Sequence, residues 1–251
     1  MTNLFDISGK VAVITGGNRG LGRDIALGFA DQGASVAVIS TKYSEEIESE
    51  LQKKGIKAKS YAFDLSDFEK YDELVNNIVR DFGTIDILVN NAGVQRRHAA
   101  VEFPVEDWDF VMNVNCKAPF LLCQKVGKIM IDKGYGKIIN MASLLSFQGG
   151  LTVPAYTASK SAVSGFTKSL SNEWAKLGIS VNCIAPGYMS TDMNEALIND
   201  ETRSRQILER IPAGRWGKPS DVVGTAIFLS SSASDYVSGF TIAVDGGWLG
   251  R

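Results

Sequence analysis

Tyr156 and Lys160 stand four residues apart in the stretch Tyr-Thr-Ala-Ser-Lys, and Ser143 precedes the tyrosine by thirteen residues. Residues four apart share one face of a helix, so a phenol and an ammonium at this spacing project side by side. A neighbouring cation favours the phenolate, and we therefore expect Lys160 to lower the Tyr156 pKa from its ordinary value of about 10. Such a tyrosine exchanges protons with an alcohol or a ketone near neutral pH. An isolated pair of this kind is more often exposed on an amphipathic helix. Other motifs in the sequence are therefore needed to identify the pair as catalytic.

The composition indicates an ordinary globular protein without a nucleic-acid or membrane partner. The chain has 251 residues, 45% of them hydrophobic and 22% charged, with a formal net charge of −2. No apolar run reaches the length of a membrane span, and the start MTNLFDISGK lacks the apolar core of a signal peptide, so we expect a cytoplasmic location. Cys116, Cys123 and Cys183 lack metal-ligand spacing, and we expect free thiols with neither a disulfide nor a metal site.

Apolar runs of strand length alternate with longer amphipathic stretches along the whole chain. The runs are rich in Val, Ile and Ala without strict alternation, as in strands buried on both faces of a parallel sheet. They are Val11–Thr15, Ser35–Ile39, Ala58–Phe63, Ile85–Asn90, Lys137–Met141, Ser180–Ala185 and Thr241–Val244. The stretches of helix length are Leu21–Gln32, Glu45–Lys54, Phe68–Phe82, Val105–Lys133, Ala155–Leu177 and Asp221–Ser230. This order predicts a single α/β domain over residues 1–251, with a doubly wound parallel sheet of about seven strands and helices on both faces.

The segment 188–216 departs from this rhythm. It is long and polar, with short helical patterns over Thr191–Leu197 and Glu201–Ile211. Connections of this length in a compact domain are usually functional, and open α/β sheets bind ligands beyond their strand ends. We expect this segment to cover the substrate.

The first strand runs into the loop Thr-Gly-Gly-Asn-Arg-Gly-Leu-Gly, which comes immediately before a helical pattern. Glycines at such a junction allow a tight turn and let backbone N–H groups approach a pyrophosphate at a helix N-terminus. Plain turns also use glycine, but the position between strand and helix favours a dinucleotide. The loop residues that we expect to contact the cofactor are Gly16, Asn18, Arg19, Gly20 and Leu21.

Two further strand ends carry residues that suit a nucleotide. Asp64 and Leu65 follow the third strand, where a carboxylate would accept from an adenine amino group; the alternative is that Asp64 caps the next helix. The fourth strand ends in Asn-Asn-Ala-Gly, and Asn91, Ala92 and Gly93 would form a backbone wall beside a ribose. The alternative for these three residues is a plain turn.

The glycine loop, Asn-Asn-Ala-Gly, Ser143, Tyr-Thr-Ala-Ser-Lys and Ala-Pro-Gly follow one another in an order and spacing that resemble the short-chain dehydrogenase/reductase family. The resemblance covers essentially the whole chain. It implies a Rossmann-type sheet, a nicotinamide cofactor and a catalytic set of Ser143, Tyr156 and Lys160, with Asn115 as the fourth member. It also implies a homotetramer. The residues that line the nicotinamide by this resemblance are Pro186, Gly187 and Thr191.

The family resemblance gives each member of the catalytic set a role in moving a proton while hydride passes between the cofactor and a carbinol carbon. Tyr156 would donate the proton to the ketone oxygen, and Ser143 would hold that oxygen by hydrogen bonding. Lys160 would lower the Tyr156 pKa and bind the nicotinamide ribose. Asn115 would hold a water that returns the proton through Lys160.

The choice between NAD and NADP depends on the end of the second strand. A carboxylate there would accept from the ribose 2′-hydroxyl and repel a 2′-phosphate, but the matching position is Ser40. Arg19 and Lys42 could instead meet a 2′-phosphate, although isolated basic residues are more often solvated. These residues favour NADP or dual use, while the closer resemblance described next favours NAD. We predict NAD, with NADP as the alternative.

Four stretches narrow the substrate by resemblance, namely Glu209–Gly217, Ser234–Trp248, Leu144–Gly150 and Asn172–Lys176. They are similar to a bacterial branch of the family that interconverts 5-keto and 5-hydroxy groups of 3-deoxy-2-keto sugar acids in uronate breakdown. A substrate of this class carries a carboxylate, and arginine matches carboxylate geometry.

Arg96, Arg97, Arg203 and Arg205 are candidates for that carboxylate, and Arg97 and Arg203 are preferred. Any one of them could instead be a surface residue paired with an acid. The full set of residues that we expect at the substrate is Arg97, Ser143, Gln148, Tyr156, Tyr188 and Arg203.

Two other interpretations remain open. One is a different short-chain reductase, such as a gluconate 5-dehydrogenase or a 3-oxoacyl-thioester reductase. The other is a dinucleotide-sensing protein that uses the fold without catalysis, although a mere binder has no need for Ser143, Tyr156 and Lys160 together.

Overall fold

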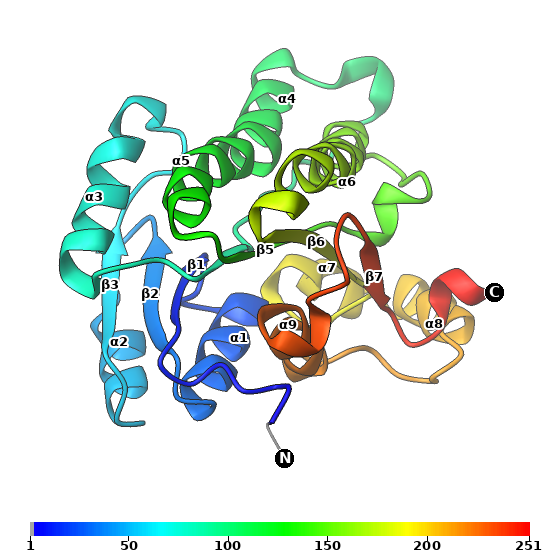
Figure 1. The fold of residues 1–251 in the computed structure, drawn as a ribbon. Coiled ribbons are helices and arrows are strands. Elements are labelled where there is room, and N and C mark those ends of the chain that lie inside the picture. The colour runs from blue at the N-terminus through cyan, green and yellow to red at the C-terminus, as the bar shows by residue number, and fades with distance from the viewer. Residues whose placement is uncertain (1–2) are drawn as a thin grey trace.

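The structure is a computed structural model that describes residues 3–251. Seven strands form one parallel sheet in the order β3-β2-β1-β4-β5-β6-β7 (Figure 1), as the strand pattern predicts. The strands are β1 Val11–Thr15, β2 Ser35–Ser40, β3 Ala58–Ala62, β4 Ile87–Asn90, β5 Gly136–Met141, β6 Ile179–Pro186 and β7 Thr241–Val244. Each begins and ends within two residues of its predicted bounds.

Helices cover both faces of the sheet, so that the domain has three layers (Figure 1). On one face lie α1 Gly20–Asp31, α2 Glu45–Gln52 and α9 Val223–Ser230. On the other face lie α3 Tyr71–Phe82, α4 Val105–Met112, α5 Ala118–Lys133 and α6 Pro154–Trp174. The predicted single domain with a doubly wound sheet is confirmed, since both layers close on the same strands.

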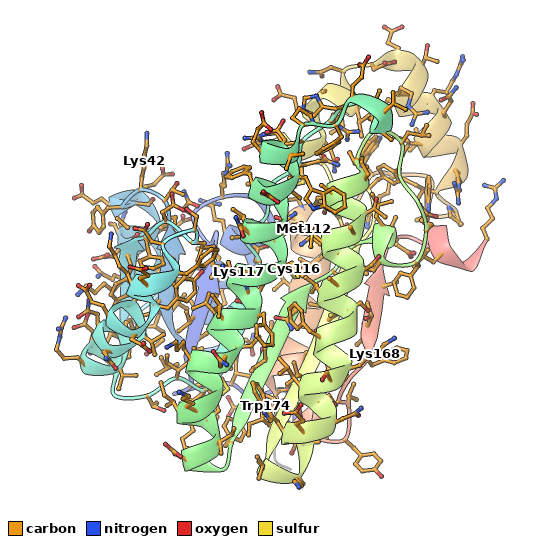
Figure 2. The ribbon with its side chains drawn as sticks, turned by 90° about the horizontal axis from the view of Figure 1, so that it is seen from above. Lys42, Met112, Cys116, Lys117, Lys168 and Trp174 are labelled. Carbon is orange, nitrogen blue, oxygen red and sulfur yellow. The ribbon has the colours of Figure 1, made fainter. Side chains whose placement is uncertain are left out.

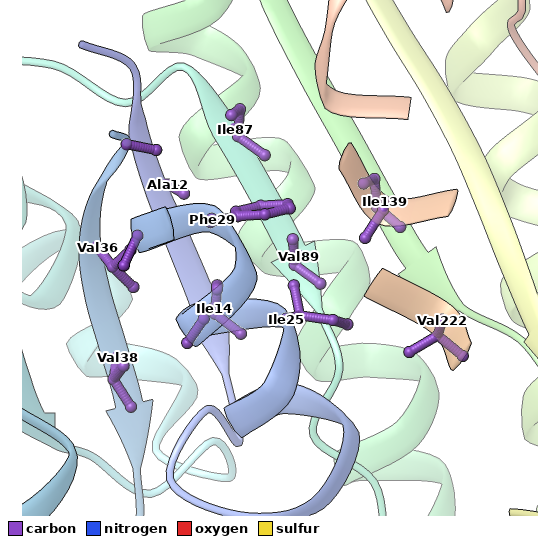
Figure 3. Packing of buried hydrophobic residues seen from close by; sticks show 14 of the residues in the cluster. Ala12, Ile14, Ile25, Phe29, Val36, Val38, Ile87, Val89, Ile139 and Val222 are labelled. Atoms are coloured by element: carbon purple, nitrogen blue, oxygen red, sulfur yellow. The ribbon is translucent and has the colours of Figure 1, made fainter. Parts of the chain in front are cut away.

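Each strand feeds two separate cores because its side chains alternate between the faces. Ala12 and Ile14 of β1 pack with Phe29 of α1, whereas Val13 between them packs with Leu122 of α5. Figure 3 shows the first of these cores, in which Phe29 lies between α1 and the strands. Burial on both faces explains why the strands read as continuous apolar runs.

The predicted helical segment Val105–Lys133 is interrupted. A π-turn over Asn113–Lys117 joins α4 to α5, and Figure 2 shows Met112, Cys116 and Lys117 along this path beside α6. Pro119 lacks an N–H and therefore cannot donate the usual helical hydrogen bond to the carbonyl of Asn115, four residues earlier. The turn places the buried Asn115 at the break.

The carboxyl ends of the strands meet at one edge of the sheet, and β1 and β4 are neighbours there although they are far apart in the chain. Such a switch in strand order is where open α/β sheets bind dinucleotides. The segment 188–216 leaves β6 at this same edge and contains α7 Glu195–Ile198 and α8 Glu201–Arg210. Within residues 3–251, no helix is both long enough and apolar enough to cross a membrane.

Candidate active site

Ser143 begins the turn that follows β5. Its hydroxyl accepts from the N–H of Leu145 at 3.2 Å, and the neighbouring Ser146 donates to the carbonyl of Lys160 at 2.7 Å. These bonds tie the end of β5 to the helix that carries the tyrosine and the lysine. The Ser143 hydroxyl thereby faces Tyr156 and lowers the pKa of that phenol by hydrogen bonding.

Tyr156 and Lys160 lie in the first two turns of α6, on the face expected from their spacing. The Lys160 ammonium is 5.7 Å from the centre of the Tyr156 ring and donates to the carbonyl of Met141 at 2.6 Å. The lysine is only 4% exposed. A buried ammonium without a carboxylate partner is costly, which indicates a site that uses the charge.

The pKa values of Tyr156 and Lys160 differ from what the sequence predicts for this pair. Burial raises the pKa of Tyr156, and this outweighs the lowering by Ser143 and by the positive charge of Arg97. The prediction that Lys160 brings the tyrosine pKa below its ordinary value is therefore wrong for this structure. Burial also lowers the pKa of Lys160 to about 8. The low-polarity surroundings favour the neutral form of both groups.

The side chain of Asn115 is hydrogen-bonded to the loop after β4. Its side-chain oxygen accepts from the N–H of Val94 at 2.8 Å, while its amide donates to the carbonyl of Val94 at 2.8 Å and to the Ser159 hydroxyl at 3.2 Å. The side chain is thus fully engaged. If Asn115 holds a water, its main-chain carbonyl in the π-turn has to do so.

The glycine loop is shaped for a close approach of backbone to a ligand. Gly16 and Gly20 have backbone φ angles of +65° and +54°, which residues with a side chain rarely adopt. A Cβ on Gly22 would lie 2.3 Å from the carbonyl oxygen of Gly16 and 2.4 Å from the Asn91 amide. The first turn of α1 carries no acidic residue and no side-chain cap, so its N–H groups are available to an anion.

The loop after β4 is pinned to the glycine loop by Thr15. The Thr15 hydroxyl accepts from the N–H groups of Asn91 and Ala92 at 3.0 Å each, and the Asn91 amide donates to the carbonyls of Thr15 and Gly16. A Cβ on Gly93 would lie 3.7 Å from the Lys160 ammonium. Asn91 therefore joins the two loops, and Gly93 lets the chain pass close to the lysine.

The remaining residues predicted for the cofactor lie around this cradle. The Ser40 hydroxyl donates to the carbonyl of Lys42, and the Asp64 carboxylate accepts from the N–H and hydroxyl of Ser66 at 2.8 Å each. Asp64 thus makes a local turn with Ser66 through one carboxylate oxygen, Oδ1, but it does not cap the next helical turn, Phe68–Lys70, whose N-cap is Asp67. Leu65 is buried beneath it. Lys42 points outward from the molecule (Figure 2).

The glycine loop also meets the segment 188–216. Arg19 forms an ion pair with Asp192 at 3.6 Å, and Thr191 is the nearest side chain to Gly20. Both charged side chains are more than three-quarters exposed, so the pair stabilises little by itself. Gly187 packs against Asp245 of the C-terminal segment, where a Cβ would lie 2.6 Å from the Asp245 backbone.

The four candidate arginines differ in their partners. Arg96 pairs with Asp107 at 3.2 Å, and Arg205 lies 3.9 Å from Glu209. Arg97 and Arg203 pair with no acid within residues 3–251, and they contact the glutamine side chains of Gln95 and Gln206 instead. The charge of Arg97 reaches Tyr156. The preferred pair thus contains the two of these four arginines without a counter-charge, and the charge of Arg97 is the one that lowers the pKa of the phenol.

Tyr188 and Gln148 belong to an aromatic cluster under α8. The Tyr188 ring lies 4.7 Å from Trp248 and 5.7 Å from Trp216, measured between ring centres. The Gln148 carbonyl oxygen accepts from the Trp248 indole at 3.2 Å and from Arg210 at 3.4 Å. Trp248 and Arg210 were not among the predicted site residues; the position of Arg210 three residues after the buried Ile207 on α8 is the signal that could have found it.

A cavity of about 270 Å³ lies between the ends of β6 and β7 and the segment after α8, and Gly187 and Tyr188 are among its lining residues. It contains none of Ser143, Tyr156 and Lys160. Its Arg215 is held by both carboxylate oxygens of Asp221, at 2.6 and 3.0 Å, and so is not free for an anion. We therefore assign the chemistry to the catalytic set and not to this cavity.

Comparison with known proteins identifies the family. The model of the short chain dehydrogenase family matches residues 10–202. The chain belongs to this family. A 2-dehydro-3-deoxy-D-gluconate 5-dehydrogenase from Dickeya dadantii (strain 3937) is 52% identical over 250 residues, which is 99% of each chain.

Two solved structures of the family are also similar. One, from Agrobacterium tumefaciens, is described as a candidate 2-deoxy-D-gluconate 3-dehydrogenase with bound NADP; it is 49% identical, covers 100% of both chains and has a TM-score of 0.93. The other is a gluconate 5-dehydrogenase from Burkholderia cenocepacia J2315 in complex with NADP and tartrate. It is 39% identical, with 99% of this chain and 98% of the other covered and a TM-score of 0.94.

Membership of the short-chain dehydrogenase family makes the protein an NAD(P)-dependent oxidoreductase that acts on CH–OH groups. The residues present fit a dinucleotide, because the glycine loop leaves no room for a Cβ at Gly22 and the N–H groups at the start of α1 have no competing cap. No group of three or more His, Cys, Asp or Glu side chains in the described chain is placed to hold a metal ion.

Proposed function

We propose that this protein interconverts the 5-keto and 5-hydroxy groups of a 3-deoxy-2-keto sugar acid. The observation that carries the proposal is the positive charge of Arg97, which pairs with no acid within residues 3–251 and lowers the pKa of Tyr156, because it offers a cation for an acidic, polyhydroxylated substrate to a proton-transferring set. The name of the Dickeya relative supports the same reaction. Because this relative is named as an enzyme, the name also favours this function over a dinucleotide-sensing role.

Each member of the catalytic set has a task that follows from its surroundings. A bound nicotinamide supplies the hydride to the ketone carbon or accepts it from the alcohol. Tyr156 gives its phenolic proton to the ketone oxygen, and Ser143 donates a hydrogen bond where negative charge develops. Lys160 stabilises the phenolate that is left, and its position under Gly93 suits contact with a ribose hydroxyl.

The tyrosine is re-protonated through Lys160 in this proposal. Asn115 and Ser159 form a buried polar path next to the lysine, since the Ser159 hydroxyl accepts from Asn115 and donates to the carbonyl of Tyr156 at 2.7 Å. The Asn115 carbonyl would hold the water of the relay. The side chain of Asn115 fixes the loop at Val94 and so keeps Gly93 close to the lysine.

We propose that the protein accepts both NAD, as predicted, and NADP. No carboxylate stands at the end of β2 to repel a 2′-phosphate, because Ser40 occupies that position and bonds to its own loop. Arg19 stands nearby in an exposed, weak ion pair that a phosphate can replace. The two solved relatives described above contain NADP.

We further propose that the segment 188–216 covers the substrate and that the protein is a homotetramer. Ile207 and Ile211 of this segment pack with Trp248 and with Leu144, the residue that follows Ser143. Exposed aromatic rings mark two faces for other copies of the chain: Phe120 meets Phe166 edge to face across α5 and α6, and Phe240 lies beside β7 at 63% exposure. A cytoplasmic location stays a prediction.

A substrate panel tests this function. We expect reduction of a 3-deoxy-2,5-diketo sugar acid, with NADH and with NADPH, at a kcat/KM at least about tenfold above that of 5-keto-D-gluconate and of an acetoacetyl thioester. A preference for 5-keto-D-gluconate would make the protein a gluconate 5-dehydrogenase, and a preference for the thioester would make it an acyl reductase. Turnover of none of the three would contradict the proposal.

The pH profile of ketone reduction is expected to follow Lys160. Because burial lowers the pKa of this lysine to about 8, the ammonium is present below that pH and is lost above it. Without the charge, the phenolate is not stabilised, and kcat/KM falls about tenfold per pH unit above the break. The variant Lys168→Met, on the exposed side of the same helix, serves as the control and should keep the same break. A profile that stays flat to pH 10 would contradict this role.

A further inference from the structure

Arg210 is held in place without a counter-charge. Within residues 3–251 no carboxylate pairs with it, yet its guanidinium is not free to move, because it lies 4.0 Å over the centre of the Trp248 ring and donates to the Gln148 carbonyl oxygen at 3.4 Å. Arginine that is stacked and hydrogen-bonded in this way has given up its flexibility while keeping its charge and most of its donors. That is the arrangement expected of an anion receptor.

The hydrogen bonds of Gln148 explain why the Arg210 guanidinium is ordered. Its oxygen accepts from two partners, the Trp248 indole N–H and the Arg210 guanidinium, and neither partner can accept a hydrogen bond. The amide nitrogen of Gln148 must therefore face away from both. Trp248 is itself 4% exposed and packs with Leu144 and Ile207, so the cluster has a rigid base.

The position of Arg210 suits the far end of the proposed substrate. Gln148 lies five residues after Ser143 on the same loop, and Leu144 packs against Ile211, which follows Arg210. Arg210 thus faces this loop from α8, whereas Arg97 comes from the loop after β4 and acts on Tyr156. In a 3-deoxy-2-keto sugar acid the carboxylate is four bonds from the reacting carbon 5. Its receptor is therefore needed away from the phenol.

We propose that Arg210 binds the carboxylate of the substrate and that Trp248 and Gln148 are positioning residues for it. This inference rests on the proposed function, since it requires a sugar acid as substrate. It also replaces Arg203 as the arginine of α8 that meets the carboxylate, because the Arg203 guanidinium donates to Gln206 of its own helix, whereas that of Arg210 donates to Gln148 on the loop after Ser143. Arg97 is left to contact the oxygens near the reacting carbon.

The test compares an acid with its neutral counterpart. Kinetics are measured for the 3-deoxy-2,5-diketo acid and for its primary amide, with the wild-type protein, with Arg210→Met and with Arg80→Met as the control, since Arg80 is an exposed arginine of α3 beside Asp81. We expect Arg210→Met to lower kcat/KM for the acid by roughly 10- to 100-fold, mainly through KM, and to leave the amide within about twofold. Arg80→Met should change neither, and Arg210→Lys should retain part of the preference because it keeps the charge.

The positioning role of Trp248 has its own readout. Trp248→Phe keeps an aromatic ring under Arg210 but loses the N–H to Gln148, and we expect KM for the acid to rise about three- to tenfold with kcat and the cofactor KM unchanged. An equal loss for acid and amide in Arg210→Met would overturn the proposal in favour of a purely structural role. If the wild-type protein prefers 5-keto-D-gluconate, the same comparison is made with that acid and its amide. The proposed substrate then fails while Arg210 is still tested.

Discussion

Replacement of Tyr156 by phenylalanine lowers kcat for ketone reduction by about a thousandfold and leaves the cofactor Kd within about twofold. The hydroxyl is the only group removed, and it is the proton donor for the ketone oxygen. The ring stays in place on α6, so the Lys160 ammonium keeps its bond to Met141 and the cradle for the cofactor is unchanged. Steady-state kinetics and a fluorescence titration with NADH measure the two quantities separately.

The control for this variant is Tyr135→Phe. Tyr135 lies at the opposite end of β5, between α5 and that strand, and its ring contacts the ammonium groups of Lys10 and Lys133. Removal of its hydroxyl should change kcat by less than about twofold. Near-normal turnover in Tyr156→Phe would remove the tyrosine from the reaction and would leave Ser143 and Lys160 without a proton donor.

Gly22→Ala is expected to weaken binding of the cofactor by about 10- to 100-fold, because relief of overpacking of this kind costs about 1–3 kcal/mol. The added Cβ would lie 2.3 Å from the Gly16 carbonyl oxygen and 2.4 Å from the Asn91 amide. The glycine loop and the loop after β4 cannot both stay in position, since Asn91 is bonded to Gly16 and Thr15. The measurement is the Kd for NADH and for NADPH by calorimetry.

Gly224→Ala is the matched control, because within residues 3–251 a Cβ on this helical glycine meets no atom within 4 Å apart from its chain neighbours and the backbone of its own helix. Alanine at that position should leave the cofactor Kd unchanged and keep or slightly raise the melting temperature. If Gly22→Ala binds both cofactors as tightly as the wild type, the glycine loop is not the cradle proposed here.

Much of the fold follows from the sequence for a simple physical reason. Strands buried on both faces must be apolar throughout, and so runs such as Val11–Thr15 and Ser35–Ser40 stand out from the amphipathic helices between them. The π-turn at Asn113–Lys117 was not predicted, although Pro119 was visible. Periodicity describes the path of a helix, whereas the turn depends on one missing N–H and on packing against α6.

The candidate site could be predicted only where its residues act through local spacing. Tyr156 and Lys160 share a helix, so their proximity was readable, but the pKa of the tyrosine depends on burial by the whole fold and moved in the other direction. The sequence alone does not indicate which arginines lack an acidic partner. Arg96 and Arg97 are adjacent in the chain, and only the position of Asp107 shows that the first is paired.

The proposed reaction is hydride transfer at carbon 5 of a 3-deoxy-2-keto sugar acid. The test is reduction of the 3-deoxy-2,5-diketo acid with reduced cofactor that carries deuterium at both positions of carbon 4 of the nicotinamide, followed by NMR of the product. We expect one deuterium at carbon 5 in a single configuration, and none at carbon 2. Deuterium at carbon 2, or none in the product, would contradict the account.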